Sequence, residues 1–354
     1  MESARVTVGL DLGDQYSAVC VLDAMGKVVE ERRVRTTREG MEKMCGQWSD
    51  RRRVVMEVGT HSPWASRLVE GHGHEVVVAN PRKVRLIFQT DRKQDKVDAE
   101  VLARLGRMDV KLLSPIRHRG ARAQADLAVV KSRDCLVRSR TSMINHVRGV
   151  MKSMGYRLRK CSGASFHRRV LEEIPEELRP ALLPVVGVIG ELTAQIERYD
   201  REIERLCAEA YPETRLLRQV KGVGAVTALS YVLAIEDPGR FEKSRSVGAY
   251  LGLRPRVDQS GSSDRQLPIS KAGDEFLRRL LVNCAHYILG PFGEDCELRR
   301  KGEEIAARGG KNAKKRAVVA VARKLAVLLH RLWVTGEAYE PVGYGKGKQA
   351  AVCG

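Results

Sequence analysis

The sequence is poor in aromatic residues, has no paired cysteine motif and contains no long apolar run. Aromatics make up 5% of the 354 residues, which argues against an aromatic-rich binding scaffold. The eight cysteines form no C-x-x-C pair, so we expect free thiols in a reducing cytoplasm and no structural zinc site. The longest uncharged runs, 222–235 and 280–293, have 14 residues each, which suits a buried helix and is too short to span a bilayer.

The first twenty residues also lack the apolar core of a signal peptide. Four charged residues interrupt them: Glu2, Arg5, Asp11 and Asp14. Together with the short apolar runs, this pattern predicts a cytoplasmic protein that does not enter a membrane.

Acidic residues are in short supply relative to basic ones. The chain has 63 Lys and Arg against 44 Asp and Glu, which gives a formal net charge of +19. A small acidic substrate needs only a few positive charges, so this excess indicates a polyanionic partner. A hydrophobic content of 43% in a chain of this length is sufficient for two or three domains with sizeable cores.

The positive charge is concentrated in two blocks. Residues 114–169 contain 14 Lys and Arg and two acids, whereas residues 299–324 contain ten Lys and Arg and two acids. An isolated charge run is usually a solvated helix face, but two blocks of this size favour contact with a phosphate backbone. In the first block we expect Arg138, Arg140 and Arg148 to bind nucleic acid.

The N-terminal part has the alternation of short β-strands. Residues 5–33 predict three strands with a turn at 23–27, and further strands are expected at 53–57 and 75–79. Helices are expected after Thr37, from Ser62 and from Asp95. Three antiparallel strands followed by alternating helix and strand is the order of an RNase-H-like (RuvC-like) α/β domain, which we assign to residues 1–112.

The middle of the chain has helical periodicity. A heptad seam with spacings of three and four runs through Ile189, Leu192, Ile196, Tyr199, Ile203 and Leu206. The upstream basic segment has a similar stripe at Val130, Val137, Thr141, Ile144 and Met151.

These stripes predict a coiled-coil, nucleic-acid-binding arm over residues 113–212. Its two antiparallel helices would be joined near Gly155 to Pro184. A compact bundle has the same periodicity and remains an alternative. A mostly helical domain over 213–340 and a flexible tail over 341–354 would follow.

Four carboxylates stand where such a fold would bring them together. Asp11 and Glu57 end the first and fourth expected strands, and Asp95 and Asp98 lie three apart at the start of a helix. A cluster of this kind repels itself unless cations neutralise it, and hard oxygen ligands suit Mg²⁺. Each acid alone is commonly a solvated residue or a helix cap. The ordered set of four in a basic chain predicts a site for phosphodiester chemistry.

The turn at 11–13 also fits the first phosphate loop of actin-like kinases and ATPases. That fold needs a second Asp-x-Gly-Gly loop in the middle of the chain. The nearest match, at 237–240, reads Asp-Pro-Gly-Arg and is poor. The sequence therefore favours the nuclease-like arrangement.

Three polar segments in the last third are further candidates. Gly222 and Gly224 precede a predicted helix, so their turn could hold a phosphate on backbone N–H groups or could be a turn without a ligand. Lys271 could contact a phosphate or be solvated at a helix start. Ser260 lies in a polar, glycine-containing loop, where a serine is usually a turn residue and only sometimes a nucleophile.

With these residues assembled, nearly the whole chain resembles the DEDD transposases of bacterial insertion sequences, the group numbered 110. The N-terminal similarity lies at 8–13, 56–60 and 93–99, where Gln94 replaces the commoner Thr or Asn. The length of the basic middle segment also departs from the family. The C-terminal similarity is more specific, because four motifs occur in the family's order, at 220–224, 252–256, 259–263 and 269–274.

The resemblance implies a RuvC-like catalytic domain with Asp11, Glu57, Asp95 and Asp98 as Mg²⁺ ligands, and a C-terminal transposase domain with Ser260 as nucleophile. It further implies recombination of donor and target DNA, guided by a structured RNA from the element and carried out by a homo-oligomer, from dimer to tetramer. Such a protein would be associated with the bacterial nucleoid.

Two other functions remain open on the residues alone. A Holliday-junction resolvase would use the same carboxylates with water as the nucleophile and would not need the Ser260 segment. A nucleic-acid-binding protein without chemistry would keep the carboxylates for structural reasons. Metal-dependent DNA strand cleavage would distinguish the transposase and the resolvase, which both predict it, from the non-catalytic binding protein, which does not.

Overall fold

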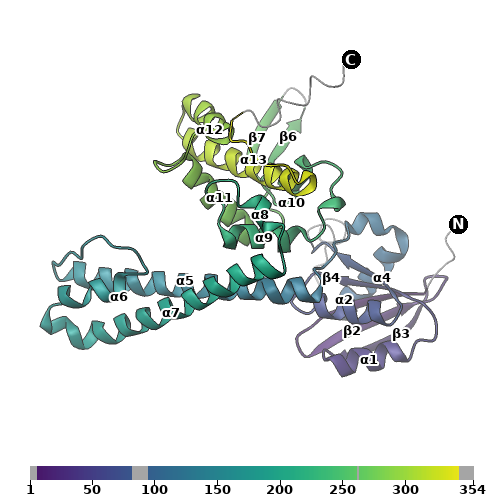
Figure 1. Ribbon diagram of the computed structural model, residues 1–354. Helices are drawn as coiled ribbons and strands as arrows, with labels where there is room; N and C mark the ends of the chain where they lie inside the picture. Colours follow the sequence, from purple (N-terminus) through teal and green to yellow (C-terminus); the bar gives the residue numbers. More distant parts are fainter. Residues whose placement is uncertain (1–5, 82–94, 261–262, 343–354) are drawn as a thin grey trace, which may run out of the picture. The chain divides into compact units, whose positions relative to one another are not determined.

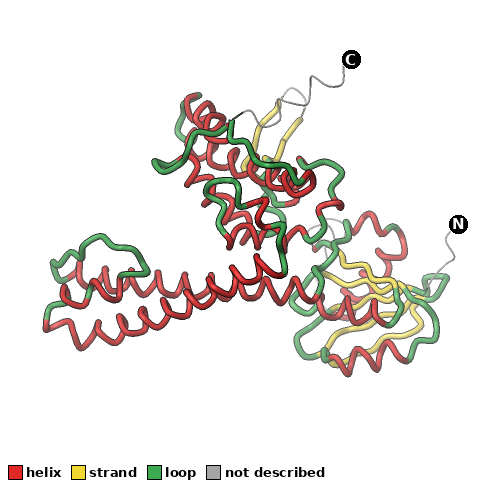
Figure 2. The backbone as a smooth tube through the Cα atoms, in the orientation of Figure 1, coloured by secondary structure: helices red, strands yellow, loops and turns green. Residues whose placement is uncertain are grey.

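The computed structural model describes residues 6–81, 95–260 and 263–342. The chain divides into two compact units, residues 1–121 and 122–354, which are treated separately below. Strands occur in two places, a sheet in the first unit and a hairpin in the second, and the remaining elements are helical (Figure 2). The expected mixed α/β N-terminal part and mostly helical remainder are thus confirmed.

The first unit is built on a five-stranded sheet of order β3-β2-β1-β4-β5 (Figure 1). β1, β2 and β3 are antiparallel neighbours, whereas β4 runs parallel to both β1 and β5. The strands are β1 (Thr7–Asp11), β2 (Tyr16–Leu22), β3 (Val28–Arg35), β4 (Arg53–Glu57) and β5 (Glu75–Ala79). All five were predicted from the sequence, the first from alternating apolar residues and others, such as β4, from short apolar runs.

Helices cover both faces of this sheet. Alternate residues of a strand point to opposite faces, so Val8 and Leu10 of β1 pack on one side and Gly9 faces the other. The first side is covered by α1 (Arg38–Gly46) and α2 (Ser62–Gly71), and the second by α4 (Asp95–Met108). Thr37 caps α1 by accepting a hydrogen bond from the Gly40 N–H, as its position before the helix predicts.

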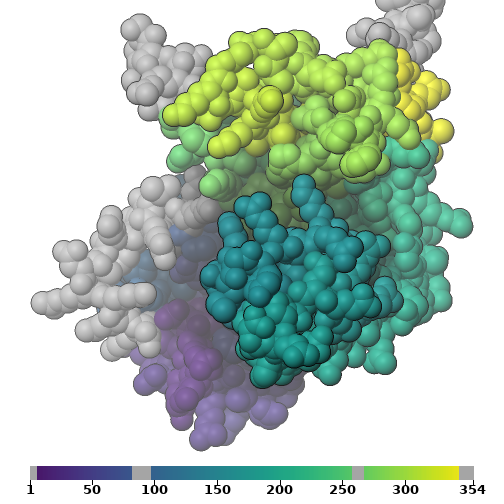
Figure 3. All heavy atoms as spheres, turned by 90° about the vertical axis from the view of Figure 1, so that its left-hand side faces the viewer, coloured from purple at the N-terminus to yellow at the C-terminus, as the bar shows by residue number. Residues whose placement is uncertain are grey.

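In the second unit, two long helices form an arm. α5 (Ala121–Ser153) and α7 (Arg179–Glu209) run antiparallel, because Arg133 bonds to Asp200 and, further along α5, Arg140 bonds to Thr193. The apolar seam includes the buried residues Val130, Ile144, Val147, Met151, Ile189, Ile196 and Ile203. α6 (Phe166–Arg169) packs at the free end of the arm, and this teal end faces the viewer in Figure 3.

The structure corrects two details of the arm prediction. Thr141 is exposed and donates its hydroxyl hydrogen to the Val137 carbonyl, so it is not part of the buried stripe. Val147, which the predicted stripe did not include, is fully buried. The connection also ends earlier than expected, since α7 begins at Arg179 and continues through Pro184. Proline is poorly tolerated in a helix interior because it lacks an N–H, but here it lies in the second turn on an exposed side.

The rest of the second unit packs around a helical core. Its helices are α8 (Thr214–Leu217), α9 (Ala225–Ile235), α10 (Arg245–Tyr250), α11 (Glu275–Leu289), α12 (Glu297–Ala307) and α13 (Ala313–Thr335). Fully buried Tyr231 donates its hydroxyl hydrogen to the Ala326 carbonyl, 2.6 Å away, which links α9 to α13. A hairpin of β6 (Pro255–Ser260) and β7 (Ser263–Ile269) was not predicted. No helix in the described ranges has the length and apolarity needed to cross a membrane.

Candidate active site and nucleic-acid interface

Asp11 and Glu57 are neighbours at one end of the sheet. Leu10 of β1 pairs with Met56 of β4, and the two acids are the next residues along these parallel strands. Within each strand the acid shares a face with the residue two positions earlier, Gly9 or Val55, and both of these face α4. The two carboxylates therefore lie at adjacent carboxyl ends on the face that α4 covers.

Helix α4 lies close against this face because glycine leaves room for it. A Cβ on Gly9 would come within 1.8 Å of the Ala99 carbonyl oxygen, and one on Gly106 would come within 2.2 Å of a Val55 methyl. Such close approach of backbone to sheet is possible only without a side chain. The position of α4 is therefore fixed by backbone contact.

The direction of α4 brings its first turn to the carboxylate end. Near its last turn, the Gly106 carbonyl accepts a hydrogen bond from Arg53, the first residue of β4. Since the last turn lies at the amino ends of the parallel strands, the first turn with Asp95 and Asp98 lies toward the end that carries Asp11 and Glu57. The topology thus brings the four predicted positions to one edge.

The side-chain arrangement at this edge is described only in part. The Asp95 side chain lies outside the described residues, while Asp11, Glu57 and Asp98 are partly buried. Within the described part of the chain, no three His, Cys, Asp or Glu side chains come together as a metal site. The chemistry of the donors fits Mg²⁺, because all four are carboxylates, which are hard oxygen ligands.

A pair of histidines that the sequence did not single out lies near this edge. His61, after β4, faces Asp14 after β1 with 3.6 Å between Nε2 and Oδ1, and its Nδ1 accepts a hydrogen bond from the Trp64 indole. His118 lies 2.8 Å from the buried hydroxyl of Ser62. Burial, assisted by two neighbouring arginines, lowers the pKa of His118. No motif spacing signals the contact of His61 with Asp14 or that of His118 with Ser62, because each joins residues that are far apart in the sequence.

The predicted nucleophile lies at the tip of the β6–β7 hairpin. Ser260 is the last residue of β6 and pairs with Ser263, the first residue of β7, so it stands at a strand end and not in an open loop. Its side chain lies outside the described residues.

The base of the hairpin is held firmly by buried Arg278. Its guanidinium donates to the carbonyls of Leu251 and Ala272, at 3.1 and 2.9 Å. Gly252 has φ +69° and no room for a Cβ, which would lie 2.1 Å from the Ala272 carbonyl oxygen. These contacts bring together two segments that the sequence presents as separate motifs, 252–256 and 269–274.

Lys271 and the Gly222–Gly224 turn lie on ordered backbone. Lys271 is exposed with φ +53°, and its N–H donates to the Gly252 carbonyl at 3.1 Å, so its unusual backbone belongs to the base of the hairpin. Gly222 has φ +92° and packs under Tyr287, while Gly224 caps α9. The predicted roles of these three residues in nucleic-acid binding remain predictions.

The three arginines predicted to bind nucleic acid each contact the arm itself. Arg138 is exposed and lies 3.0 Å from Asp134, whereas Arg140 is partly buried and donates to the Thr193 hydroxyl at 3.2 Å. The guanidinium of Arg148 stacks on the Phe166 ring, 5.4 Å from its centroid. Their binding role remains a prediction, and two of them also hold the arm together.

Other basic residues of the arm present their charge more openly. Between residues 152 and 169, five of the six Lys and Arg are exposed and make no ion pair among the described residues: Lys152, Arg157, Lys160, Arg168 and Arg169. They gather at the end of the arm, around α6 and the last turn of α5. Composition alone identified the basic block, but only the fold shows which members face solvent.

Comparison with known proteins gives two family matches, one over most of the first unit and the start of the second, the other within the second unit. A DEDD transposase model of the 110 group matches residues 8–155, and a model described as transposase, IS116/IS110/IS902 family, matches residues 214–292.

Similar full-length proteins agree with these matches. The chain is 29% identical to the transposase for insertion sequence element IS1111A of Coxiella burnetii, over 94% of this chain and 90% of the relative. It is 32% identical to the IS1328 transposase of Yersinia enterocolitica, over 66% of this chain and 69% of the relative. It is also 24% identical to the pilin gene-inverting protein of Moraxella bovis, over 77% of this chain and 76% of the relative.

Proposed function

Since the chain belongs to the IS116/IS110/IS902 family of transposases, we propose that it recombines DNA through a carboxylate site in its first unit and Ser260 in its second. The observation that carries the proposal is the common edge of the sheet: Asp11 and Glu57 end adjacent parallel strands, and α4 begins toward the same end. The strand order β3-β2-β1-β4-β5, in which two neighbouring pairs are antiparallel and two are parallel, supports an RNase-H-like fold for this unit.

In the proposed reaction, the Ser260 hydroxyl oxygen attacks a DNA phosphorus. The Oγ–P bond forms as the P–O bond to the leaving nucleoside breaks, and the serine proton is released while the leaving oxygen gains one. Attack by a hydroxyl of the partner strand reverses this step and frees the serine. The number of phosphodiester bonds is conserved, so strand exchange requires neither net hydrolysis nor ATP.

Asp11, Glu57, Asp95 and Asp98 would hold Mg²⁺, which would stabilise negative charge at the phosphate when bound. Without metal, the negatively charged carboxylates would repel each other, so the site would lower the stability of the fold until cations neutralise it. The backbone contact at Gly9 would keep α4 in place against that repulsion.

We also propose that the arm acts as a coiled coil that binds a structured guide RNA, and that donor and target DNA are held by a dimer or tetramer acting at the nucleoid. The exposed cations at the end of the arm support this, because phosphate contact needs accessible positive charge. Purifying the full chain from its host and sequencing the bound RNA tests the proposal. RNA transcribed from the flank of its own gene is expected, and random cellular RNA would contradict it.

The carboxylates are tested by neutralising them singly. Asp11→Asn, Glu57→Gln and Asp98→Asn should each lower Mg²⁺-dependent cleavage of DNA by roughly 1000-fold, since the lost charge stabilisation is worth several kcal/mol. Without metal, their thermal stability should be unchanged or slightly raised. Asp14→Asn is the matched control, because this exposed carboxylate lies three residues from Asp11 and is expected to retain activity. Wild-type cleavage by all three variants would place the active site elsewhere.

A further inference from the structure

A cavity of about 440 Å³ lies among α11, α12 and α13 of the second unit. Leu289, Ala306, Ala317 and Val318 give it an apolar wall, and Lys314 and Lys315 stand at its edge. This volume falls within the range of roughly 300–1,000 Å³ that is usual for ligand pockets. An apolar wall with a few cationic groups suits a ligand that has both a flat apolar part and a negative charge.

The two lysines are available to such a ligand. Both are exposed, and neither forms an ion pair with a carboxylate of the described residues. The cavity has one acidic lining residue, Glu303, but its carboxylate is held by the Arg299 Nε at 2.9 Å. The net charge offered to a ligand is therefore positive.

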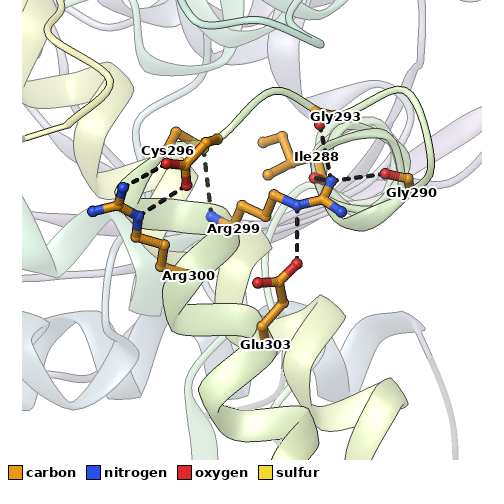
Figure 4. Close-up of polar contacts among 8 residues, drawn as sticks. Ile288, Gly290, Gly293, Cys296, Arg299, Arg300 and Glu303 are labelled. Atoms are coloured by element: carbon orange, nitrogen blue, oxygen red, sulfur yellow. Dashed lines mark hydrogen bonds and ion pairs between the residues drawn. The ribbon is translucent and has the colours of Figure 1, made fainter.

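Arg299 also fixes the wall that Gly290 contributes. Its Nη1 donates to the carbonyls of Ile288, Gly290 and Gly293, at 3.0, 2.8 and 3.0 Å (Figure 4). One turn further along α12, Gly302 allows close packing on the same part of α11, since a Cβ there would lie 2.5 Å from a Leu289 methyl. The cavity is thus formed before any ligand binds.

We propose that this cavity receives one nucleotide extruded from a nucleic-acid strand, with its base against Leu289, Ala306 and Val318 and its phosphate at Lys314 and Lys315. The inference rests on the proposed function as a DNA recombinase, and it adds a binding site remote in sequence from the carboxylates and Ser260. An unstacked base gains apolar contact in such a cavity, which offsets part of the cost of extrusion.

The test uses the full chain and single-stranded DNA containing 2-aminopurine, whose fluorescence rises when it is unstacked from its neighbours. Wild type should raise the fluorescence several-fold at saturation. Ala306→Phe should fill the cavity and abolish the rise, while affinity measured by anisotropy changes less than about threefold, because the charges remain. Lys314→Gln/Lys315→Gln should weaken binding and reduce the rise.

The matched control is Lys243→Gln/Arg245→Gln, which removes the same charge from exposed residues that lie outside the two basic blocks and do not line the cavity. It should retain the full rise. Adenosine 5′-monophosphate should displace the probe from the cavity better than inorganic phosphate does. Equal displacement by phosphate would mean a simple anion site and would overturn the proposal.

Two further outcomes separate this inference from the proposed function. Tight, salt-sensitive DNA binding without a fluorescence rise, or a rise that persists in folded Ala306→Phe, overturns the cavity proposal and leaves the recombinase proposal standing. Failure of the wild type to bind any nucleic acid overturns both.

Discussion

Helices α4 and α5 are held to their neighbours in different ways. α4 lies on the sheet through backbone contact, with Gly9 and Gly106 leaving no room for a Cβ. α5 instead packs on α7 through an apolar seam flanked by polar pairs such as Arg140 with Thr193, and its Gly149 has open space around it. The comparison shows that backbone contact fixes α4 in position, whereas side-chain contacts along a seam support α5 and leave other side chains of it exposed. The first arrangement suits the proposed carboxylate site, and the second suits the proposed phosphate-binding arm.

Adding one methyl group, at Gly9 beneath α4 and at Gly149 on the exposed side of α5, should give the largest difference in stability between the two regions. Gly9→Ala should destabilise the first unit by about 1–3 kcal/mol or more, because overpacking forces backbone to move. Gly149→Ala should stabilise the arm by roughly 0.5–1 kcal/mol, because alanine favours an exposed helix interior. Amide hydrogen exchange in α4 and α5 measures the two regions separately. If both substitutions changed stability by the same amount and in the same direction, α4 and α5 would not differ in how they are held.

A smaller difference, in the salt dependence of RNA binding, is expected between two sets of three basic residues on the arm. Replacing exposed Arg157, Lys160 and Arg168 by Gln should lower the salt dependence of RNA binding by roughly 2–3 in log–log slope, at roughly 0.7–0.9 for each of three lost phosphate contacts. The triple Gln variant of Arg138, Arg140 and Arg148 should lower the slope less and also destabilise the arm. Binding measured across a salt series distinguishes the two sets. If both triple variants kept the wild-type salt slope, the basic residues of the arm would be exposed to solvent without contacting RNA phosphates.

The smallest effect concerns two cysteines. Burial raises the pKa of Cys45 in α1 to about 11, whereas Cys135 in α5 is exposed. Only the thiolate reacts, and at pH 8 about 0.1% of a group with that pKa is ionised even when reagent can reach it. Maleimide should therefore label Cys135 quickly and Cys45 very slowly, with the Cys45 rate rising toward pH 11. Rapid labelling of Cys45 at pH 8 would mean that α1 opens from the sheet.

The sequence was informative where a local pattern determines a structure. The strand that ends at Asp11 follows from apolar alternation, and the strand that ends at Glu57 follows from a short apolar run. The helix that starts at Asp95 follows from the spacing of its apolar residues. The close contact of Gly9 with Ala99 could not be predicted, because it depends on two segments 90 residues apart that meet only in the fold.

Two features were not predicted, for related reasons: the β6–β7 hairpin, and which arginines of the arm point to solvent. Residues 255–269 are polar and lack apolar alternation, so their strand structure depends on pairing with each other and on the anchor at Arg278. The basic block was evident from composition, but whether Arg140 points to Thr193 or to solvent depends on the register of α5 against α7.

The most direct test of the central claim is a denaturing gel of labelled DNA incubated with Mg²⁺ and the full chain. The serine mechanism predicts a covalent protein–DNA adduct with wild type, Ser262→Ala and Ser263→Ala, and none with Ser260→Ala, which should still bind RNA and DNA. An adduct that survives in Ser260→Ala would remove this residue from the mechanism. Cleavage without an adduct in any lane would contradict the account and favour a resolvase that uses water.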